Sequence, residues 1–195
     1  MTVLLLLGKG FEHMETGVFI DIMGWAREIF KHDVRVTTCG YSREVISTFG
    51  VPIVVDTVID AVRAEDYDAL AIPGGFRSSG FFEEAYDSAF LRLIRDFDAQ
   101  EKPIASVCTA ALALGRSGIL SGRRATTYHL DQSGRINELE SYGVNVMRER
   151  LVTDGKIITS CGPSSAAEVA FALLEMLIGT EDTEKVRAAM GYCGK

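Results

Sequence analysis

Six short apolar runs, separated by helical stretches, most constrain what this chain can fold into. Strands that are apolar along nearly their whole length are buried on both faces, and helices between them make the parallel connections. The pattern therefore predicts a doubly wound α/β fold, with a mostly parallel sheet covered by helices on both faces. The predicted strands are residues 3–7, 34–38, 69–72, 104–107, 125–127 and 156–160.

Two further segments add strands to this pattern. Residues 51–55 precede a helical stretch and predict an extra strand or one arm of a β-hairpin. Residues 151–160 contain Asp154-Gly155, a dipeptide typical of a tight turn, and predict a hairpin. The chain has 195 residues and shows no linker or repeat, so we expect one domain over residues 1–195.

Charge and hydropathy narrow the possible partners. The formal net charge is −7, which argues against nucleic acid or an anionic membrane surface and favours a small-molecule substrate. The apolar run 3–7 is too short for a signal sequence and lacks a basic start, and no run reaches the length of a membrane span. We expect a cytoplasmic protein with no membrane partner.

The four cysteines form no Cys-x-x-Cys pair and have no histidine at metal-ligand spacing, so we expect free thiols and no metal. Cys39 and Cys161 stand at strand ends but are followed by glycine, which indicates small buried cysteines. Cys193 lies near the end of the chain. Cys108 differs from these three and is the candidate functional centre.

Cys108 joins the strand 104–107 directly to a helical stretch. Such a strand-to-helix turn, called a nucleophile elbow, exposes the side chain at the end of a sheet, and Ser106 and Ala110 are small enough to fit it. The first amides of the following helix favour a thiolate. The pattern predicts a reactive Cys108.

Three strand exits are expected to meet at this cysteine. Ligands of open α/β sheets bind beyond the carboxyl ends of the strands. If strands 3–7, 69–72 and 104–107 are neighbours, their exits bring together the first loop, Pro73-Gly74-Gly75 and Cys108. Amides of Gly74 and Gly75, with the amide of Thr109, are then candidates for an oxyanion site. An ordinary tight turn is the alternative for the glycine pair.

Glu15 is the candidate acid. It precedes the apolar stripe of the first predicted helix, residues 16–30, where a carboxylate commonly compensates the helix dipole. Beside a thiolate in a half-buried pocket, however, its pKa would rise, and it would stay protonated and donate a hydrogen bond to sulfur.

The same helix has an unusually broad apolar surface, made of two adjacent stripes. A deeply packed helix and a helix that also contacts a second subunit both account for it, and the second predicts a homodimer. The stripes are Val18, Ile22, Trp25 and Ile29, and Phe19, Met23, Ala26 and Phe30.

Four segments, residues 12–16, 73–75, 105–108 and 153–163, together resemble the DJ-1/ThiJ/PfpI superfamily, and the acidic residue of the first segment is similar to its DJ-1-like branch. The resemblance implies a flavodoxin-like fold and a dimer formed through the first helix. It also implies that Glu15 is hydrogen-bonded to an oxidation-prone Cys108. Members act as cofactor-independent glyoxalases or deglycases on methylglyoxal-type carbonyls, or as oxidative-stress sensors.

The proton shuttle departs from this pattern. Glyoxalase-type members have a Thr-Thr-His run after the cysteine, whereas this chain has Thr126-Thr127-Tyr128-His129. Because consecutive strand residues face opposite sides, His129 takes the catalytic position only if the chain has left the strand by Thr127. Tyr128 and His13 are the alternatives to His129.

Other activities of the superfamily remain open. A non-enzymatic sensor or chaperone would use oxidation of Cys108. Isonitrile hydratases are similar around the cysteine but use an aspartate where this chain has Glu15, and PfpI-type amidases or proteases have histidine where it has Thr109. The substrate is not identified by the sequence; side chains such as Phe76, Arg77, Phe81 and Phe82 are expected to shape its pocket.

Overall fold

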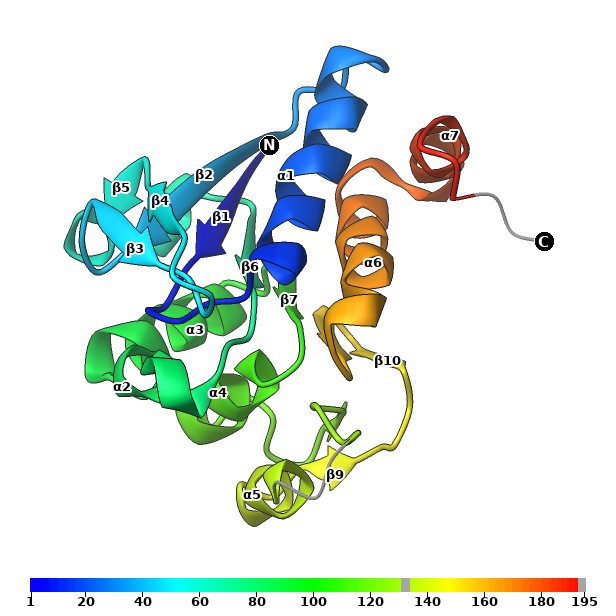
Figure 1. Cartoon of the computed structure of the whole chain (residues 1–195). Helices are drawn as coiled ribbons and strands as arrows, with labels where there is room; N and C mark the ends of the chain where they lie inside the picture. The colour runs from blue at the N-terminus through cyan, green and yellow to red at the C-terminus, as the bar shows by residue number, and fades with distance from the viewer. Residues whose placement is uncertain (131–133, 193–195) are drawn as a thin grey trace.

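The computed structural model describes residues 1–130 and 134–192 and contains a seven-stranded sheet (Figure 1). The strand order is β10-β11-β7-β6-β1-β2-β5, and only β10 runs antiparallel to its neighbour. This confirms the predicted flavodoxin-like α/β class. The strands of this sheet are β1 (Thr2–Leu6), β2 (Arg35–Gly40), β5 (Thr57–Val58), β6 (Ala69–Ile72), β7 (Ile104–Ser106), β10 (Leu151–Asp154) and β11 (Ile157–Ser160).

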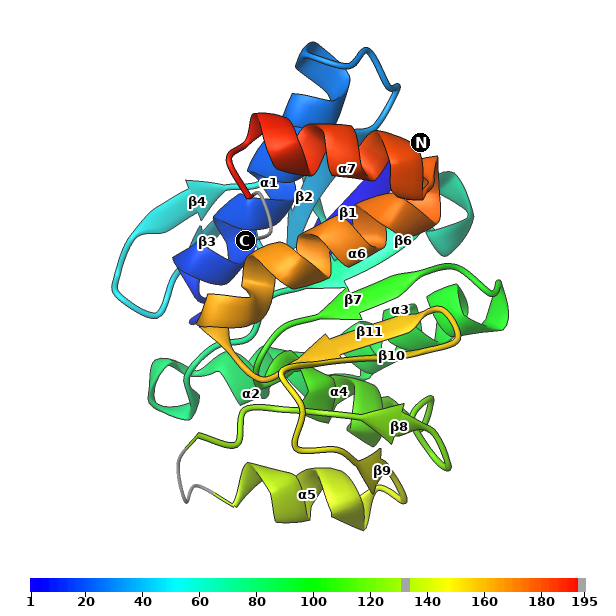
Figure 2. The same cartoon turned by 90° about the vertical axis from the view of Figure 1, so that its right-hand side faces the viewer.

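Helices cover both faces of the sheet (Figure 2). One layer is formed by α1 (His13–Glu28), α6 (Ala166–Ile178) and α7 (Thr180–Ala189), and the other by α2 (Phe81–Ala85), α3 (Ser88–Ala99) and α4 (Ala110–Ser117). The period-two alternation of β1 divides the core, because Val3 and Leu5 pack under α1 and α6 while Leu4 and Leu6 pack under α3 and α4. No helix among the described residues combines the length and apolar character needed to span a bilayer.

Two predicted strands lie outside the main sheet. Residues 51–55 contribute β4 (Pro52–Val54), which pairs with β3 (Glu44–Ile46) as a hairpin arm. The predicted strand 125–127 is shorter than expected, because β8 covers only Arg124–Ala125 and pairs with β9 (Asn145–Val146). Beyond Ala125, the Thr126 amide donates to the Thr159 hydroxyl at 2.9 Å.

The register of the central strands sets the position of the site. β6 pairs with both β1 and β7, with Val3 opposite Ala69 and Leu70 opposite Ile104. The carboxyl ends of these three strands are therefore adjacent. The expected convergence of the first loop, the glycine pair and Cys108 is confirmed.

A peripheral unit of α5 (Arg135–Ser141), β8 and β9 lies at one end of the sheet (Figure 2). It is tied to the central domain through Glu138. The Tyr86 hydroxyl donates to the Glu138 carboxylate, and Arg77 contacts the same carboxylate at 3.4 Å. Apolar packing adds to these polar contacts, because Leu139 of α5 is fully buried in the core shared with α4.

Candidate active site

Cys108 occupies a strained turn between β7 and α4. Its φ angle is 57°, in the left-handed region that costs a non-glycine residue roughly 1–3 kcal/mol. Two hydrogen bonds hold this conformation: the Cys108 amide donates to the Ser160 carbonyl, and the Thr127 hydroxyl donates to the Cys108 carbonyl, both at 3.0 Å. Cys108 is 7% exposed and lines a cavity. This geometry is that of the predicted nucleophile elbow.

Glu15 is fully buried in the first turn of α1, next to Cys108. Burial and the nearby charge of Glu12 raise its pKa to about 8, although the Gly74 amide and the Cys108 thiol act in the opposite direction. The Gly74 amide donates to Oε2 at 2.6 Å. Oε1 has no hydrogen-bond partner of normal geometry. At neutral pH the carboxyl is mostly protonated, and Oε1 is the oxygen that can carry the proton.

The Cys108 thiol is less acidic than its place at a helix N-terminus predicts. Burial and then the charge of Glu15 raise its pKa well above the ordinary value, and the Thr109 amide opposes them only in part. The predicted contribution of the helix amides is therefore present, but desolvation outweighs it. Protonation of Glu15 removes the like charge and provides a hydrogen-bond donor to sulfur. The two groups therefore titrate as a pair that holds at most one negative charge near neutral pH.

Two of the three amides predicted for the oxyanion site already have partners in the structure. The Gly74 amide binds Glu15, and the Gly75 amide donates to the Thr109 hydroxyl at 3.0 Å. That hydroxyl donates in turn to the Gly75 carbonyl at 2.9 Å. Only the Thr109 amide faces the Cys108 sulfur.

Packing also requires both glycines. A Cβ atom on Gly74 would lie 2.8 Å from the Thr109 hydroxyl oxygen, and one on Gly75 would lie 2.3 Å from the Gly10 carbonyl oxygen. Gly74 and Gly75 therefore also form a tight turn, which was the alternative interpretation of this glycine pair. The turn brings the first loop and the β6 exit into backbone contact.

Replacing Thr109 with valine should lower the free energy of unfolding by about 1–3 kcal/mol, because the buried amide and carbonyl of Gly75 lose their shared partner. Thr109→Ser keeps the hydroxyl and is the matched control. Urea unfolding followed by circular dichroism measures the difference. A loss in Thr109→Ser with none in Thr109→Val would show that the methyl group, and not the hydroxyl, matters at this position.

A cavity of about 400 Å³ opens above the Cys108 sulfur. Its walls are mostly apolar, and the side chains of Glu12 and Arg135 are the acidic and the basic group among them. The Arg135 guanidinium lies 5.4 Å from the centre of the Tyr128 ring. The lining residues are Glu12, Met14, Gly75, Phe76, Cys108, Thr109, Tyr128, Leu130, Arg135, Pro163 and Ser164.

Of the four side chains expected to shape this pocket, only Phe76 lines it. Phe81 and Phe82 belong to the core under α3 and α4, and Arg77 packs over the Phe82 ring at 4.6 Å.

His129 does not line this cavity, contrary to the prediction. The chain has left the strand by Thr127, as the prediction required, yet Tyr128 is the side chain beside Cys108. His129 lines a separate cavity of about 220 Å³, and its Nδ1 lies 2.9 Å from the Thr127 carbonyl oxygen. His13, the other candidate, stacks on Phe11 at 5.1 Å and is likewise not among the lining residues. No described histidine therefore faces the thiol.

Several site residues were missed at the sequence level. Thr127 and Ser160 fix the Cys108 backbone, and Pro163 and Ser164 line the cavity. The position of the strand 156–160 next to β7 is the signal that would have identified the last three, because the exit of a neighbouring parallel strand reaches the same site.

The other described cysteines are buried. Burial raises the pKa of Cys39 to about 12, which makes it unreactive. Cys161 is buried at the end of β11, and Cys193 lies outside the described residues. Within residues 1–130 and 134–192, no three His, Cys, Asp or Glu side chains are grouped closely enough to hold a metal ion.

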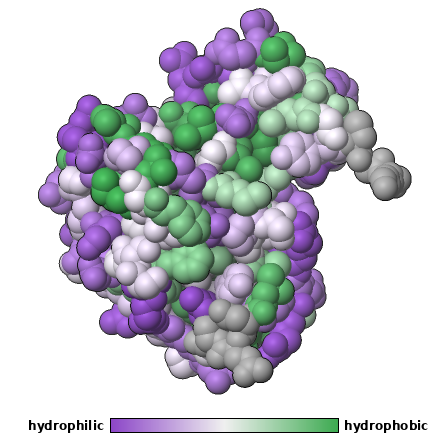
Figure 3. All heavy atoms as spheres, in the orientation of Figure 1, coloured by the Kyte–Doolittle hydropathy of each residue, from purple (hydrophilic) through white to green (hydrophobic). Residues whose placement is uncertain are grey.

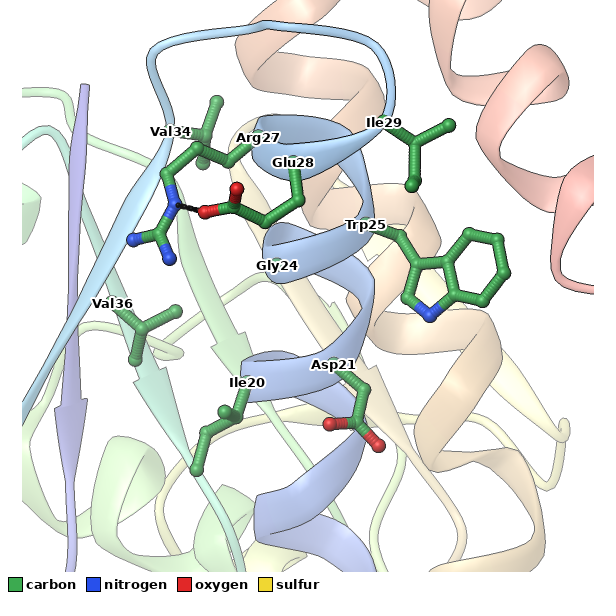
Figure 4. Close-up of a pocket in the computed structure, with 9 residues that line it drawn as sticks. All are labelled: Ile20, Asp21, Gly24, Trp25, Arg27, Glu28, Ile29, Val34 and Val36. Carbon is green, nitrogen blue, oxygen red and sulfur yellow. Dashed lines mark hydrogen bonds and ion pairs between the residues drawn. The ribbon is translucent and has the colours of Figure 1, made fainter.

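The outer face of α1 carries exposed apolar side chains. Phe19, Met23 and Ala26, from one predicted stripe, are buried, but Trp25, from the other, is 38% exposed, and Ile20 is 40% exposed. Figure 4 shows Ile20 and Trp25 projecting from opposite sides of the helix, with Gly24 between them. Together with neighbouring residues they line a groove of about 380 Å³. Figure 3 shows further hydrophobic atoms over the β3–β4 hairpin.

These features agree with a comparison to known proteins. The model of the DJ-1/PfpI family matches residues 1–176. The chain belongs to the DJ-1/PfpI family. It is 30% identical over 190 residues to the Parkinson disease protein 7 homolog of Danio rerio, covering 96% of this chain and 95% of that one. The structure of oxidized Toxoplasma gondii DJ-1 superposes with a TM-score of 0.83 at 28% identity, covering 99% of each chain.

Two other similarities show the range of the DJ-1/PfpI family. Isonitrile hydratase of Pseudomonas putida is 32% identical over 128 residues, which cover 64% of this chain and 52% of the hydratase. The family thus includes enzymes. The Arabidopsis thaliana DJ-1 homologs A and B are longer proteins, and this chain spans less than half of either.

Proposed function

We propose that this DJ-1/PfpI protein is a cysteine-dependent, cofactor-independent enzyme of the glyoxalase or deglycase type that acts on small reactive carbonyls. The observation that carries the proposal is the buried Glu15 carboxyl, with a pKa of about 8, next to Cys108 under an open cavity. An acid whose pKa lies near the working pH can both donate and accept a proton during one turnover.

The reaction begins from a minor, singly ionised form of the pair, in which Glu15 holds the proton and Cys108 is the thiolate. Sulfur attacks the aldehyde carbon of a 2-oxoaldehyde, the C–S bond forms, and the carbonyl electron pair moves to oxygen. The Thr109 amide stabilises this oxyanion, which takes the proton from Glu15 to give a hemithioacetal. The amide of Gly75 becomes a second donor when the Thr109 hydroxyl turns away from it.

Glu15, now a carboxylate, removes the proton from the carbon bound to sulfur and returns it to the adjacent carbon, while the hydroxyl proton of the hemithioacetal moves to the oxygen on that adjacent carbon. This transfer converts the hemithioacetal into a thioester. Water then cleaves the C–S bond, which releases a 2-hydroxy acid and restores the thiol. The Gly74 amide fixes Oε2 throughout, so that Oε1 performs each transfer. Glu15 thereby acts as the proton shuttle, the role that the sequence suggested for His129.

The test is the consumption of methylglyoxal by the purified protein in thiol-free buffer, with lactate measured as the product. In deuterated water the lactate should contain solvent deuterium at the carbon that bears the hydroxyl, because Glu15 exchanges its proton. Consumption no faster than by Cys108→Ala would contradict the proposal. An isonitrile and a peptide amide, assayed in parallel, test the hydratase and the amidase or protease activities.

A redox sensor or chaperone is the second candidate, because Cys108 lines a cavity and Glu15 Oε1 has no hydrogen-bond partner of normal geometry. A sulfinate oxygen on Cys108 could accept the proton that this carboxyl carries. The related Toxoplasma gondii DJ-1 was solved in an oxidized form. A dose of peroxide that leaves Cys108 without added oxygen and without any other oxidised product would contradict this role.

We also propose that the protein forms a homodimer through α1. Gly17 and Gly24 lie seven positions apart, and a Cβ atom on either would meet nothing within 4 Å, so both open onto solvent. Each costs a helix about 1 kcal/mol relative to alanine. Two such residues beside the exposed Ile20 and Trp25 allow the close approach of a second helix, and a two-fold axis lets this one face serve both subunits.

Trp25→Glu should convert the dimer into a monomer, because it buries a charge in the apolar interface. Size-exclusion chromatography with light scattering measures the mass. Gln100→Glu adds the same charge at the end of α3, on the opposite side of the sheet, and should leave the mass unchanged. A monomeric wild-type protein at micromolar concentration would refute the proposal.

A further inference from the structure

Cys161 lies directly opposite Cys108 in the sheet. β11 and β7 are parallel, with Ile157 opposite Ile104. The Ile104 amide donates to the Lys156 carbonyl, which belongs to the residue before its partner. The Cys108 amide donates to the Ser160 carbonyl at 3.0 Å with the same offset. The pairing therefore continues past the strand ends, and Cys161 is the partner of Cys108.

This pairing places the two cysteines within disulfide range. Neighbouring strands lie about 4.8 Å apart, and a disulfide requires Cα atoms separated by about 4.4–6.8 Å. Cys108 is 7% exposed and Cys161 is 5% exposed, so both residues are buried. Cys39 is on β2, separated from β7 by β6 and β1, and is too distant to react with either of them.

We propose that Cys161 is the resolving cysteine for an oxidised Cys108, so that hydroperoxides drive a reversible disulfide between them. The Cys108 thiolate attacks the terminal oxygen of the hydroperoxide; the O–O bond breaks, and the products are Cys108 sulfenic acid and an alcohol or water. The Cys161 thiolate then attacks the Cys108 sulfur. The S–S bond forms, the S–O bond breaks, and the departing hydroxide leaves as water with the proton from Cys161.

Two features of the site favour this sequence of steps. Glu15 Oε1, which has no hydrogen-bond partner of normal geometry, can bind the sulfenic oxygen and relay the proton from Cys161 to the leaving hydroxide. The left-handed Cys108 backbone directs sulfur into the cavity, where a hydroperoxide reaches it first. Rotation of the Cys108 side chain toward Cys161 then closes the bond. Disulfide formation competes with a second oxidation to sulfinate, and thus protects the thiol from an irreversible change.

The experiment treats the full chain, in a Cys193→Ser background, with hydrogen peroxide, followed by intact-mass and peptide mass spectrometry. The background protein, in which Cys161 is intact, should lose two hydrogen atoms. It should also yield a peptide pair linked through Cys108 and Cys161, which dithiothreitol separates. With Cys161→Ser, Cys108 should gain two oxygen atoms, and its sulfinate fraction after the same dose should rise several-fold. Cys39→Ala should behave like the background protein.

Equal sulfinate formation with and without Cys161, in the absence of a linked peptide, would overturn the proposal. Cys161→Ala provides a second variant, and circular dichroism establishes that each variant is folded. The result is independent of the proposed carbonyl activity. That activity is measured on the reduced protein, where Cys161→Ser should retain the wild-type rate, and a protein inactive on carbonyls can still form the disulfide.

Discussion

Replacing Cys108 with alanine is expected to slow methylglyoxal consumption by about 10³-fold or more, to the rate of the uncatalysed reaction. Every step of the proposed reaction, from the hemithioacetal to the thioester, takes place on the Cys108 sulfur. Cys108→Ser should be nearly as inactive, since a hydroxyl in the same buried position ionises far less readily than a thiol. The measurement is the initial rate of loss of the aldehyde.

The matched controls for Cys108 are the other two described cysteines. Cys39→Ala and Cys161→Ser each remove a buried thiol without altering the elbow, and both should retain the wild-type rate under reducing conditions. A residual rate in Cys108→Ala within tenfold of wild type would show that sulfur is not the nucleophile. Loss of activity in all three variants would instead indicate a general loss of structure, which circular dichroism would detect.

Replacing Glu15 with glutamine is expected to remove most of the activity while making the protein more stable at neutral and alkaline pH. Glutamine keeps the shape and can accept the Gly74 amide, but it cannot transfer a proton. A loss of about 10²–10⁴-fold in rate is therefore expected. Glu15→Asp, which keeps the acid but retracts it, should retain more activity than Glu15→Gln.

The gain in stability follows from proton binding. In the unfolded chain Glu15 ionises around its ordinary pKa of 4.5, whereas the folded protein holds this proton up to a pKa of about 8. Between these values the unfolded state has released a proton that the folded state retains, so stability falls as pH rises. The slope is at most about 1.4 kcal/mol per pH unit, and the penalty is absent below the unfolded pKa.

Urea unfolding at pH 5 and pH 8 measures this slope. The wild-type protein should lose stability between the two values through Glu15, and Glu15→Gln should lose clearly less. Asp21→Asn, which removes an exposed carboxylate from the same helix, is the control and should follow the wild type. Parallel pH profiles for wild type and Glu15→Gln would mean that Glu15 is ionised in the folded protein.

Features that repeat along the chain could be predicted from the sequence. Apolar strands separated by helices indicated the parallel sheet, and the adjacency of β1, β6 and β7 followed from one assumed strand order. Glu15, the glycine pair and Cys108 do converge. Each of these inferences depends on the order and direction of the strands, which the alternation of apolar strands and helical stretches indicates well.

The predictions that differed from the structure depended on competition between local interactions. The amides of Gly74 and Gly75 are occupied by Glu15 and Thr109, and sequence spacing does not reveal which acceptor captures a buried donor. Likewise, His129 was the candidate if the chain left the strand by Thr127; the chain does leave it, but Tyr128 is the residue that lines the cavity. The acidity of Cys108 depended on how far burial outweighs one helix amide, which only the packed structure determines.

The polar attachment of α5 through Glu138 has a consequence for how this family can diversify. Arg135, at the start of α5, contributes one wall of the cavity, whereas Glu15 and Cys108 belong to α1 and the β7 exit. The cavity wall and the reacting pair are thus carried by different elements, although α5 also packs into the core through the buried Leu139. A substitution at Arg135 can therefore change which molecules enter the cavity without removing either member of the reacting pair.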